Sequence, residues 1–297
     1  MDMSLQAAVI LVLSAMTTAA SLFIIAAGLT LIFGALRIIN VAHGSFYMYG
    51  AYFMATVFAG DGGGWLFWAG LIVTPIFVAA IGAGTEILLL RRVYERDHLV
   101  QLLITYALFL ILADLALRFW GSDNLTAPQP PVLSGAASIG SISFPAYDLF
   151  VIGCAIAVGV AMWGLLSRTM LGWTIRAAVE DPETLSASGT NVKLLFTSVF
   201  GLGSLLAGFG GAVIAPLQSV GPGMGAAVIV SAFIVAVIGG LGSIAGAAIG
   251  AIIIGVFEAA GILYAPTWAP ACIFLAMIIV LAVRPAGLLG NPAAMAD

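Results

Sequence analysis

Residues 194–257 read LLFTSVFGLGSLLAGFGGAVIAPLQSVGPGMGAAVIVSAFIVAVIGGLGSIAGAAIGAIIIGVF and contain no Asp, Glu, Lys or Arg. A run of about 20 apolar residues is enough to cross a bilayer as a helix. This run is too long for one span, and its Gly and Pro clusters are expected to divide it into two to three helices. The segment therefore predicts an integral membrane protein.

The composition of the whole chain supports this prediction. The 297 residues are 63% hydrophobic and only 7% charged, whereas soluble domains are about 45–50% apolar and about 25% charged. Five further segments also lack charged residues: 3–36, 38–60, 62–85, 149–167 and 259–283. The net charge of −4 is spread without a basic run, so nucleic acid is not an expected partner.

The apolar segments predict an all-α, polytopic bundle of eight to nine transmembrane helices in a single domain, residues 1–297. Residues 37–46 and 239–246 are candidates for broken or re-entrant segments. The expected spans are 7–34, 44–60, 65–90, 99–118, 148–166, 195–215, 226–243, 246–264 and 268–283. Because the first ten residues contain no Lys or Arg, they are read as the start of a membrane anchor and not as a cleaved signal peptide.

The basic residues predict how the chain is oriented. Nine crossings place all but one of them on the same side, which the positive-inside rule assigns to the cytoplasm. Those on that side are Arg37, Arg91, Arg92, Arg96, Arg168, Arg176, Lys193 and Arg284, with only Arg118 opposite. The N-terminus is then external and the C-terminus cytoplasmic. The longest external loop is residues 119–147, and residues 167–194 form a cytoplasmic loop.

The cytoplasmic loop carries the signals of a short helix near residues 182–188. Asp181 can cap its start, Pro182 suits its first position, and Glu183 complements the helix dipole in the first turn. Gly189 can end it in a left-handed conformation. A helix this short is marginal alone and would be better ordered against another protein. The alternative is an ordinary solvated connector.

Small residues recur in the second half of the chain. Gly242, Gly246 and Gly250 are four residues apart, which on a membrane helix predicts a face that lets another helix approach closely. The alternative is the ordinary abundance of glycine in membrane helices.

The residues needed for chemistry are few. Lys193 is the only lysine and lies outside any P-loop pattern, so the chain is not expected to hydrolyse ATP. The two histidines do not form a zinc motif, and no nucleophile elbow is present. No metal or cofactor is therefore predicted on this chain.

Three acidic residues fall within predicted spans. Glu86 and Asp114 lie near span ends, where water can reach them, whereas Glu258 lies deeper. Charges in hydrocarbon are costly and often functional, so an ion-coupled carrier is an alternative. Without a predicted cationic partner, Glu258 is interpreted as facing a pore or another subunit.

Four ordered segments resemble one protein family. They are GLTLIFGALRIINVAHGSFYMYGAYF (28–53), RAAVEDPETLSASGTNV (176–192), AFIVAVIGGLGSIAGAAIGAIIIGVFE (232–258) and VRPAGLLG (283–290). Together they are similar to the branched-chain amino acid (LIV-type) permeases of ABC importers, a family with hydrophobic amino acid and urea/amide branches.

The resemblance implies a subunit of a larger transporter in the cytoplasmic (inner) membrane of a prokaryote. The expected partners are a second homologous permease, two ABC ATPases that bind ATP and Mg, and an extracytoplasmic substrate-binding protein. Amino acids, branched-chain or otherwise apolar, would move inward. The alternatives are a urea, short-amide or other small-solute permease of the same family, an ion-coupled carrier, and an intramembrane enzyme.

The resemblance also implies roles for particular residues. In the family, the segment matching 176–192 couples the permease to the ATPase, and the segment matching 37–44 interrupts a helix near the translocation path. The expected coupling residues are Glu180, Asp181, Pro182, Glu183, Leu185, Ser188 and Gly189. The expected path residues are Arg37, Asn40, His43 and Gly44, together with Glu258.

Overall fold

The computed structural model describes residues 3–60, 64–94, 96–139 and 142–290, so both ends of the predicted domain lie partly outside it. Apart from one small hairpin and one isolated β-bridge, the regular secondary structure of the described chain is helical. Its α-helices are α1 (Met3–Leu36), α2 (His43–Val57), α3 (Trp65–Leu88), α4 (His98–Trp120), α5 (Ala146–Arg168), α6 (Met170–Glu180), α7 (Pro182–Ala187), α8 (Val192–Ile214), α9 (Met224–Gly239), α10 (Ile244–Tyr264) and α11 (Ala269–Val283). Short 3-10 turns are η1 (Leu90–Arg92), η2 (Pro131–Leu133) and η3 (Pro266–Trp268).

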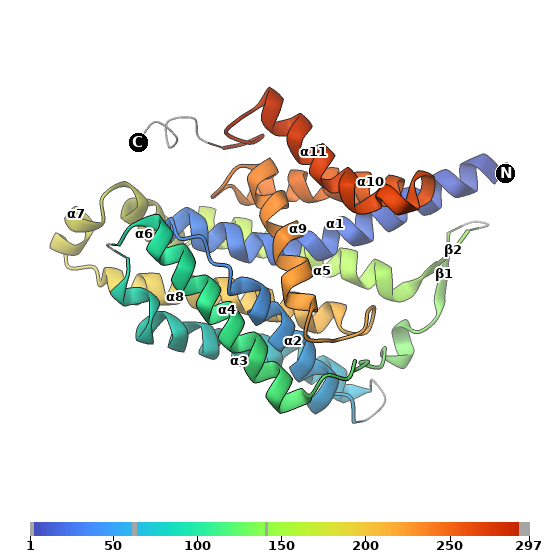
Figure 1. The fold of residues 1–297 in the computed structure, drawn as a ribbon, viewed down its shortest axis with the longest axis horizontal. Helices are drawn as coiled ribbons and strands as arrows, with labels where there is room; N and C mark the ends of the chain where they lie inside the picture. The colour runs from blue at the N-terminus through green and yellow to red at the C-terminus, as the bar shows by residue number, and fades with distance from the viewer. Residues whose placement is uncertain (1–2, 61–63, 95, 140–141, 291–297) are drawn as a thin grey trace.

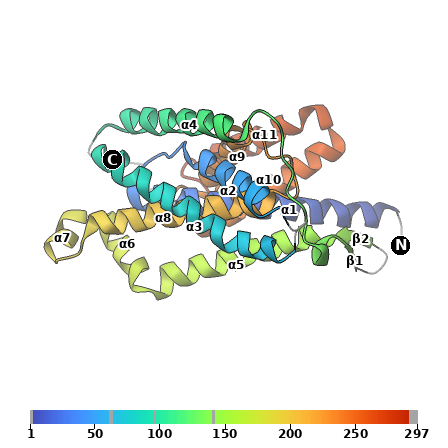
Figure 2. The same ribbon diagram turned by 90° about the horizontal axis from the view of Figure 1, so that it is seen from below.

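The helices form an elongated bundle with two distinct ends. Figure 1 shows α7 at one end, and the start of α1 and the hairpin of β1 (Ala136–Ile139) and β2 (Ile142–Pro145) at the other. We call these the α7 end and the hairpin end. Seen at right angles, α4 and α5 lie on opposite sides of a layer that contains α1 and α8 (Figure 2).

The nine predicted spans all occur as helices, but they differ in length. Among the described residues, seven helices are long and apolar enough to cross a membrane: 8–36, 65–92, 98–120, 146–168, 192–214, 244–264 and 266–283. The 15-residue α2 and the 16-residue α9 are shorter, at roughly 23 and 24 Å against a hydrocarbon core of about 30 Å.

The short helix α2 is enclosed by other helices. All residues from His43 to Tyr52 are buried, and α8, α9 and α3 pack around it. Two of its side chains also donate hydrogen bonds to the backbone of α4: the Ser45 hydroxyl to the Phe109 carbonyl at 3.3 Å and the Tyr49 hydroxyl to the Leu112 carbonyl at 3.1 Å. Such bonds help membrane helices associate. The protein interior, and not lipid, therefore surrounds most of α2.

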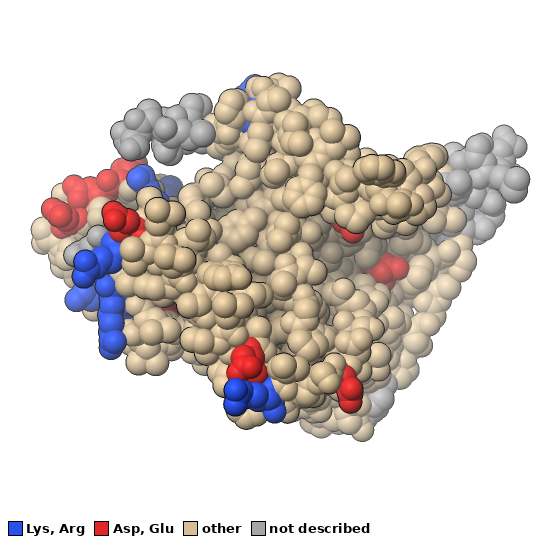
Figure 3. Space-filling model, in the orientation of Figure 1, with Lys and Arg blue, Asp and Glu red and all other residues tan. Residues whose placement is uncertain are grey.

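The outer surface is apolar between the two ends. Figure 3 shows a broad uncharged region across the middle of the molecule, while most Lys and Arg side chains gather near the α7 end. Large apolar side chains such as Ile72, Phe119 and Trp163 are well exposed on the molecule. A contiguous apolar surface of this extent is expected against lipid or another subunit.

Close glycine contacts hold α9, α10 and α1 together. A Cβ at Gly246 would collide with the Gly239 carbonyl, one at Gly250 would lie 2.6 Å from the Val235 carbonyl oxygen, and one at Gly255 would collide with the Ala15 carbonyl. The predicted close approach is therefore present at Gly246 and Gly250.

Gly242 does not belong to this helix face, which corrects the prediction. It precedes α10, which begins at Ile244, and has a φ of +91° in the turn after α9. The predicted span 226–243 accordingly ends early, at Gly239. Gly242 instead lies against Gly34 of α1, where an added Cβ would be 3.0 Å or slightly more from the backbone. A left-handed turn, and not a repeat, explains this glycine.

The predicted external loop, residues 119–147, contains more structure than its prolines indicate. Beyond the end of α4 it forms the β1–β2 hairpin, in which Ala136 pairs with Pro145. Its positions 140–141 lie outside the described residues. The loop is also joined to the α8–α9 connection, since Leu125 and Val220 exchange backbone hydrogen bonds of 2.9 and 2.8 Å.

Candidate coupling and translocation sites

The short helix α7 has the predicted local structure. The Asp181 carboxylate accepts hydrogen bonds from the backbone N–H groups of Glu183 at 3.0 Å and Thr184 at 2.9 Å, and from the Thr184 hydroxyl at 2.5 Å. Pro182 occupies the first turn, and Gly189 ends the segment with a φ of +92°. The helix 182–188 predicted from the sequence is thus confirmed as Pro182–Ala187.

The side chains of α7 divide into an exposed set and an inward one. Six of the seven predicted coupling residues are exposed: Glu180, Asp181, Pro182, Glu183, Ser188 and Gly189. Leu185 is different, because it is half-buried and packs against the hydrophobic core of its own chain. It attaches α7 to the bundle, and its contact with a partner stays a prediction.

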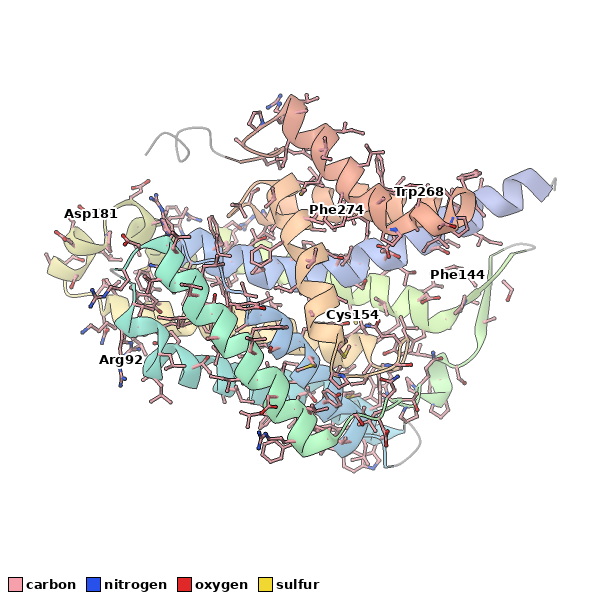
Figure 4. All side chains as sticks on the ribbon, in the orientation of Figure 1. Arg92, Phe144, Cys154, Asp181, Trp268 and Phe274 are labelled. Carbon is pink, nitrogen blue, oxygen red and sulfur yellow. The ribbon has the colours of Figure 1, made fainter. Side chains whose placement is uncertain are left out.

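Asp181 is exposed but its oxygens are engaged by the helix cap. Hydrogen bonds from the Thr184 side chain and then from the backbone hold the pKa of this carboxyl below its usual range. Asp181 and Arg92 both lie at the α7 end, far from Trp268 and Phe144 at the hairpin end (Figure 4). The free carboxylate on the helix itself is that of Glu183.

An interruption is present, but it covers only residues 37–42 of the predicted 37–44, because α1 ends at Leu36 and α2 begins at His43. The predicted residues face different surroundings. Arg37 follows the last residue of α1 and adopts a φ of +54°, which is strained for a side chain other than glycine. It is exposed and lines two adjoining cavities of about 700 and 550 Å³ at the α7 end. Asn40 is fully buried, and its amide has no hydrogen-bond partner within the described chain.

His43 and Gly44 pack inside the bundle. The His43 ring is buried, and its Nε2–H donates to the Ile25 carbonyl of α1 at 3.0 Å. A Cβ at Gly44 would collide with the Gly225 carbonyl of α9. Both residues therefore join α2 to its neighbours.

Glu258 lies on the part of α10 that is closer to its C-terminal end, Tyr264, beside a cavity that is also lined by Ile25, whose carbonyl accepts the His43 hydrogen bond. It is half-buried and lines this cavity of about 380 Å³ between α1, α9 and α10, into which Tyr47 of α2 also reaches. The five predicted path residues therefore lie in three places: the cavities beside Arg37, the interior around Asn40, His43 and Gly44, and the Glu258 cavity.

Comparison with known proteins identifies the family. Residues 11–282 match the family described as "Branched-chain amino acid transport system / permease component". This chain belongs to that family. Its membership, together with the seven apolar helices, makes this permease a multi-pass membrane protein and a transport component.

Similar proteins cover almost the whole permease. The high-affinity branched-chain amino acid transport system permease protein BraD of Pseudomonas aeruginosa is 28% identical over 293 residues, covering 93% of this chain and 94% of BraD. The corresponding LivH proteins are 30% identical in Salmonella typhimurium and 29% in Escherichia coli K12, each covering 91% of both chains. No solved structure is a significant match.

A buried polar cluster of the permease was not expected. Glu86 is fully buried, which corrects the prediction that water reaches it. Its carboxylate accepts hydrogen bonds from Tyr94 at 2.6 Å and Thr197 at 2.7 Å, and it forms a salt bridge with Arg91 at 3.2 Å. Buried charges are paired and hydrogen-bonded, so this cluster joins the ends of α3 and η1 to the start of α8.

The predicted cytoplasmic loop also contains a helix, α6, that was not predicted from the sequence. α6 begins after Thr169, whose hydroxyl accepts a 3.4 Å bond from the Gly172 N–H, and it buries Ile175 and Ala178. In the sequence, the capping residue Thr169 and the apolar spacing of Ile175 and Ala178 could have indicated this helix. Because α6 ends at Glu180, directly before α7, the loop is a pair of helices with few irregular residues.

Proposed function

We propose that this chain is one permease subunit of an ABC importer that moves branched-chain or other apolar amino acids into the cell. The observation that carries the proposal is the match of nearly the whole chain to permeases named for branched-chain amino acid transport. A capped helix with an exposed acidic side chain, on a segment similar to the family's coupling loop, supports the same assignment.

The proposed partners follow from the two ends of the molecule. ATPase subunits that bind ATP and Mg would contact α7 and the adjacent part of α6. A substrate-binding protein would contact the hairpin end, and a second permease would cover part of the apolar flank. The gathering of basic residues at the α7 end supports a cytoplasmic position for that end and for the C-terminus, with the start of α1 outside.

Two other functions compete with this proposal. A urea or short-amide permease would have the same architecture and would also contact ATPases. An ion-coupled carrier would need no ATPase, but Glu86 and Asp114, two of the acidic residues that could serve it, are paired with Arg91 and Arg118. This pairing favours the ABC importer.

Purification and uptake separate these functions. The permease is isolated in mild detergent with its co-purifying chains, reconstituted in liposomes with ATP inside, and supplied with its binding protein and labelled leucine or urea. We expect ATPase chains to co-purify and leucine to accumulate only with hydrolysable ATP. Leucine uptake driven by an ion gradient without ATP, or ATP-driven uptake of urea alone, would contradict the proposal.

A further inference from the structure

The cavity beside Glu258 contains a carboxylate but, among its described lining residues, no cationic side chain, which points to a ligand. Within the described chain, no hydrogen bond or salt bridge reaches the Glu258 carboxylate. None of the described residues lining the cavity is Lys, Arg or His. A half-buried carboxylate without a cationic neighbour is costly in a membrane protein unless something compensates its charge. A cation that enters the cavity would supply the missing partner.

The neighbouring hydroxyl groups offer acceptors to such a cation. The Thr17 hydroxyl donates its proton to the Leu13 carbonyl at 3.1 Å, and the Ser21 hydroxyl donates to the Thr18 carbonyl at 2.8 Å. Thr17 and Ser21 line the same cavity as Glu258, and their oxygens keep lone pairs for a ligand there. A primary ammonium group has three N–H donors and no acceptor, which matches one carboxylate and several hydroxyl oxygens.

Two other residues that line the cavity, Gln218 and Tyr47, supply hydrogen-bond donors. The Gln218 side-chain N–H donates to the Tyr47 hydroxyl oxygen at 2.7 Å. This leaves the Tyr47 hydroxyl proton and the second amide proton of Gln218 available, and both residues line the cavity. Leu217, Met224 and Val228 make part of the remaining wall apolar. An apolar molecule that carries both an ammonium and a carboxylate group would find a partner for each part.

We propose that this cavity binds zwitterionic apolar amino acids, with Glu258 holding the ammonium group. This proposal rests on the proposed function. It adds that a site on this chain selects amino acids over neutral amides. The cavity volume of about 380 Å³ lies at the lower end of the roughly 300–1,000 Å³ typical of small-molecule sites.

A labelling experiment tests the site without relying on transport. Ser231, which lines the cavity, is replaced in Ser231→Cys after Cys154→Ser and Cys272→Ala remove the native thiols. The permease, in nanodiscs with its co-purifying chains, is then labelled with a maleimide in the presence of leucine, isopentylamine, 4-methylpentanoate, urea or sodium chloride. Leucine and isopentylamine should slow labelling about tenfold at saturation, because an occupied cavity shields the thiol, whereas the other three should not.

Substitutions at Glu258 separate charge from packing. Glu258→Gln should abolish the protection by isopentylamine, Glu258→Asp should keep part of it, and Asp114→Asn is the matched control, since Asp114 is paired with Arg118 outside the cavity. Protection that survives Glu258→Gln, protection by sodium or urea alone, or a thiol that never reacts would each overturn the assignment. Missing ATPase chains would instead contradict the proposed function and leave the labelling result standing.

Discussion

At the scale of single residues, the Glu86 cluster combines groups that are far apart in the chain. Thr197 and Glu86 are separated by 111 positions, yet the Thr197 hydroxyl donates to the carboxylate at 2.7 Å. Removing one member of a buried ion pair leaves an uncompensated charge, which is more damaging than removing a surface charge. The cluster is therefore expected to stabilise the junction of α3 and α8.

We predict that Arg91→Met lowers the stability of the permease by about 2–3 kcal/mol, because it leaves Glu86 buried without its cation. Arg92→Met is the control, since Arg92 is exposed and next to it in sequence. Thermal unfolding in detergent, followed by the intrinsic tryptophan fluorescence, measures both. Equal midpoints for the two variants would mean that the salt bridge contributes little.

At the scale of elements, two acidic residues of the α7 segment have different roles. Asp181 caps the helix, while Glu183 is exposed on it. Glu183→Lys should therefore weaken ATPase association without unfolding the permease, because rim charges mainly affect association. Co-purification of ATPase chains measures this effect, with Glu183→Gln as a milder control. If Glu183→Lys retained the ATPase fully, the ATPase contact would not lie on α7.

Asp181→Ala should instead loosen the helix by removing its cap, so coupling should fall even where association persists. The pKa of Asp181 is lowered by its hydrogen bonds, so the cap is complete above the ordinary carboxyl range and is lost only as pH falls through the lowered pKa. The part of the substrate-stimulated ATP hydrolysis that depends on the Asp181 cap should therefore be the same at neutral and at mildly acidic pH. This prediction would be contradicted if stimulated hydrolysis fell near the ordinary pKa of an aspartate in the wild-type permease but not in Asp181→Ala.

The contact between α9 and α10 provides another test at this scale. We predict that Gly246→Ala destabilises the permease by about 1–3 kcal/mol, because its Cβ would collide with the Gly239 carbonyl. Gly153→Ala on α5 is the matched control, since a Cβ there meets nothing within 4 Å. Thermal unfolding compares the pair. If Gly246→Ala is as stable as the control, α9 and α10 can move apart without lowering the free energy of unfolding.

At the scale of the whole molecule, the orientation is testable by labelling. In a background with Cys154→Ser and Cys272→Ala, a maleimide that cannot cross membranes should react with Ser134→Cys, near the hairpin end, in intact cells. Ser188→Cys, beside α7, should react only after permeabilisation. Both positions are exposed, so access depends on the side of the membrane. The opposite pattern would reverse the proposed topology.

The sequence predicted what depends on neighbouring residues and missed what depends on distant ones. The Asp181 cap and the left-handed Gly189 follow from local rules and are confirmed. The inward position of Leu185 and the burial of Glu86 depend on packing against other helices, which no local pattern reveals. Hydropathy located nine helices, but it did not show that the short helix α2 is enclosed.

The link between Leu125 and Val220 ties the loop 119–147 to the α8–α9 connection. Two backbone hydrogen bonds join the loop to the α8–α9 connection, and Val220 is two positions from Gln218, which lines the Glu258 cavity. A load applied to the loop would be transmitted along this short backbone path to Gln218. If a substrate-binding protein docks at the hairpin end, as proposed, it would thereby act on the proposed amino-acid cavity.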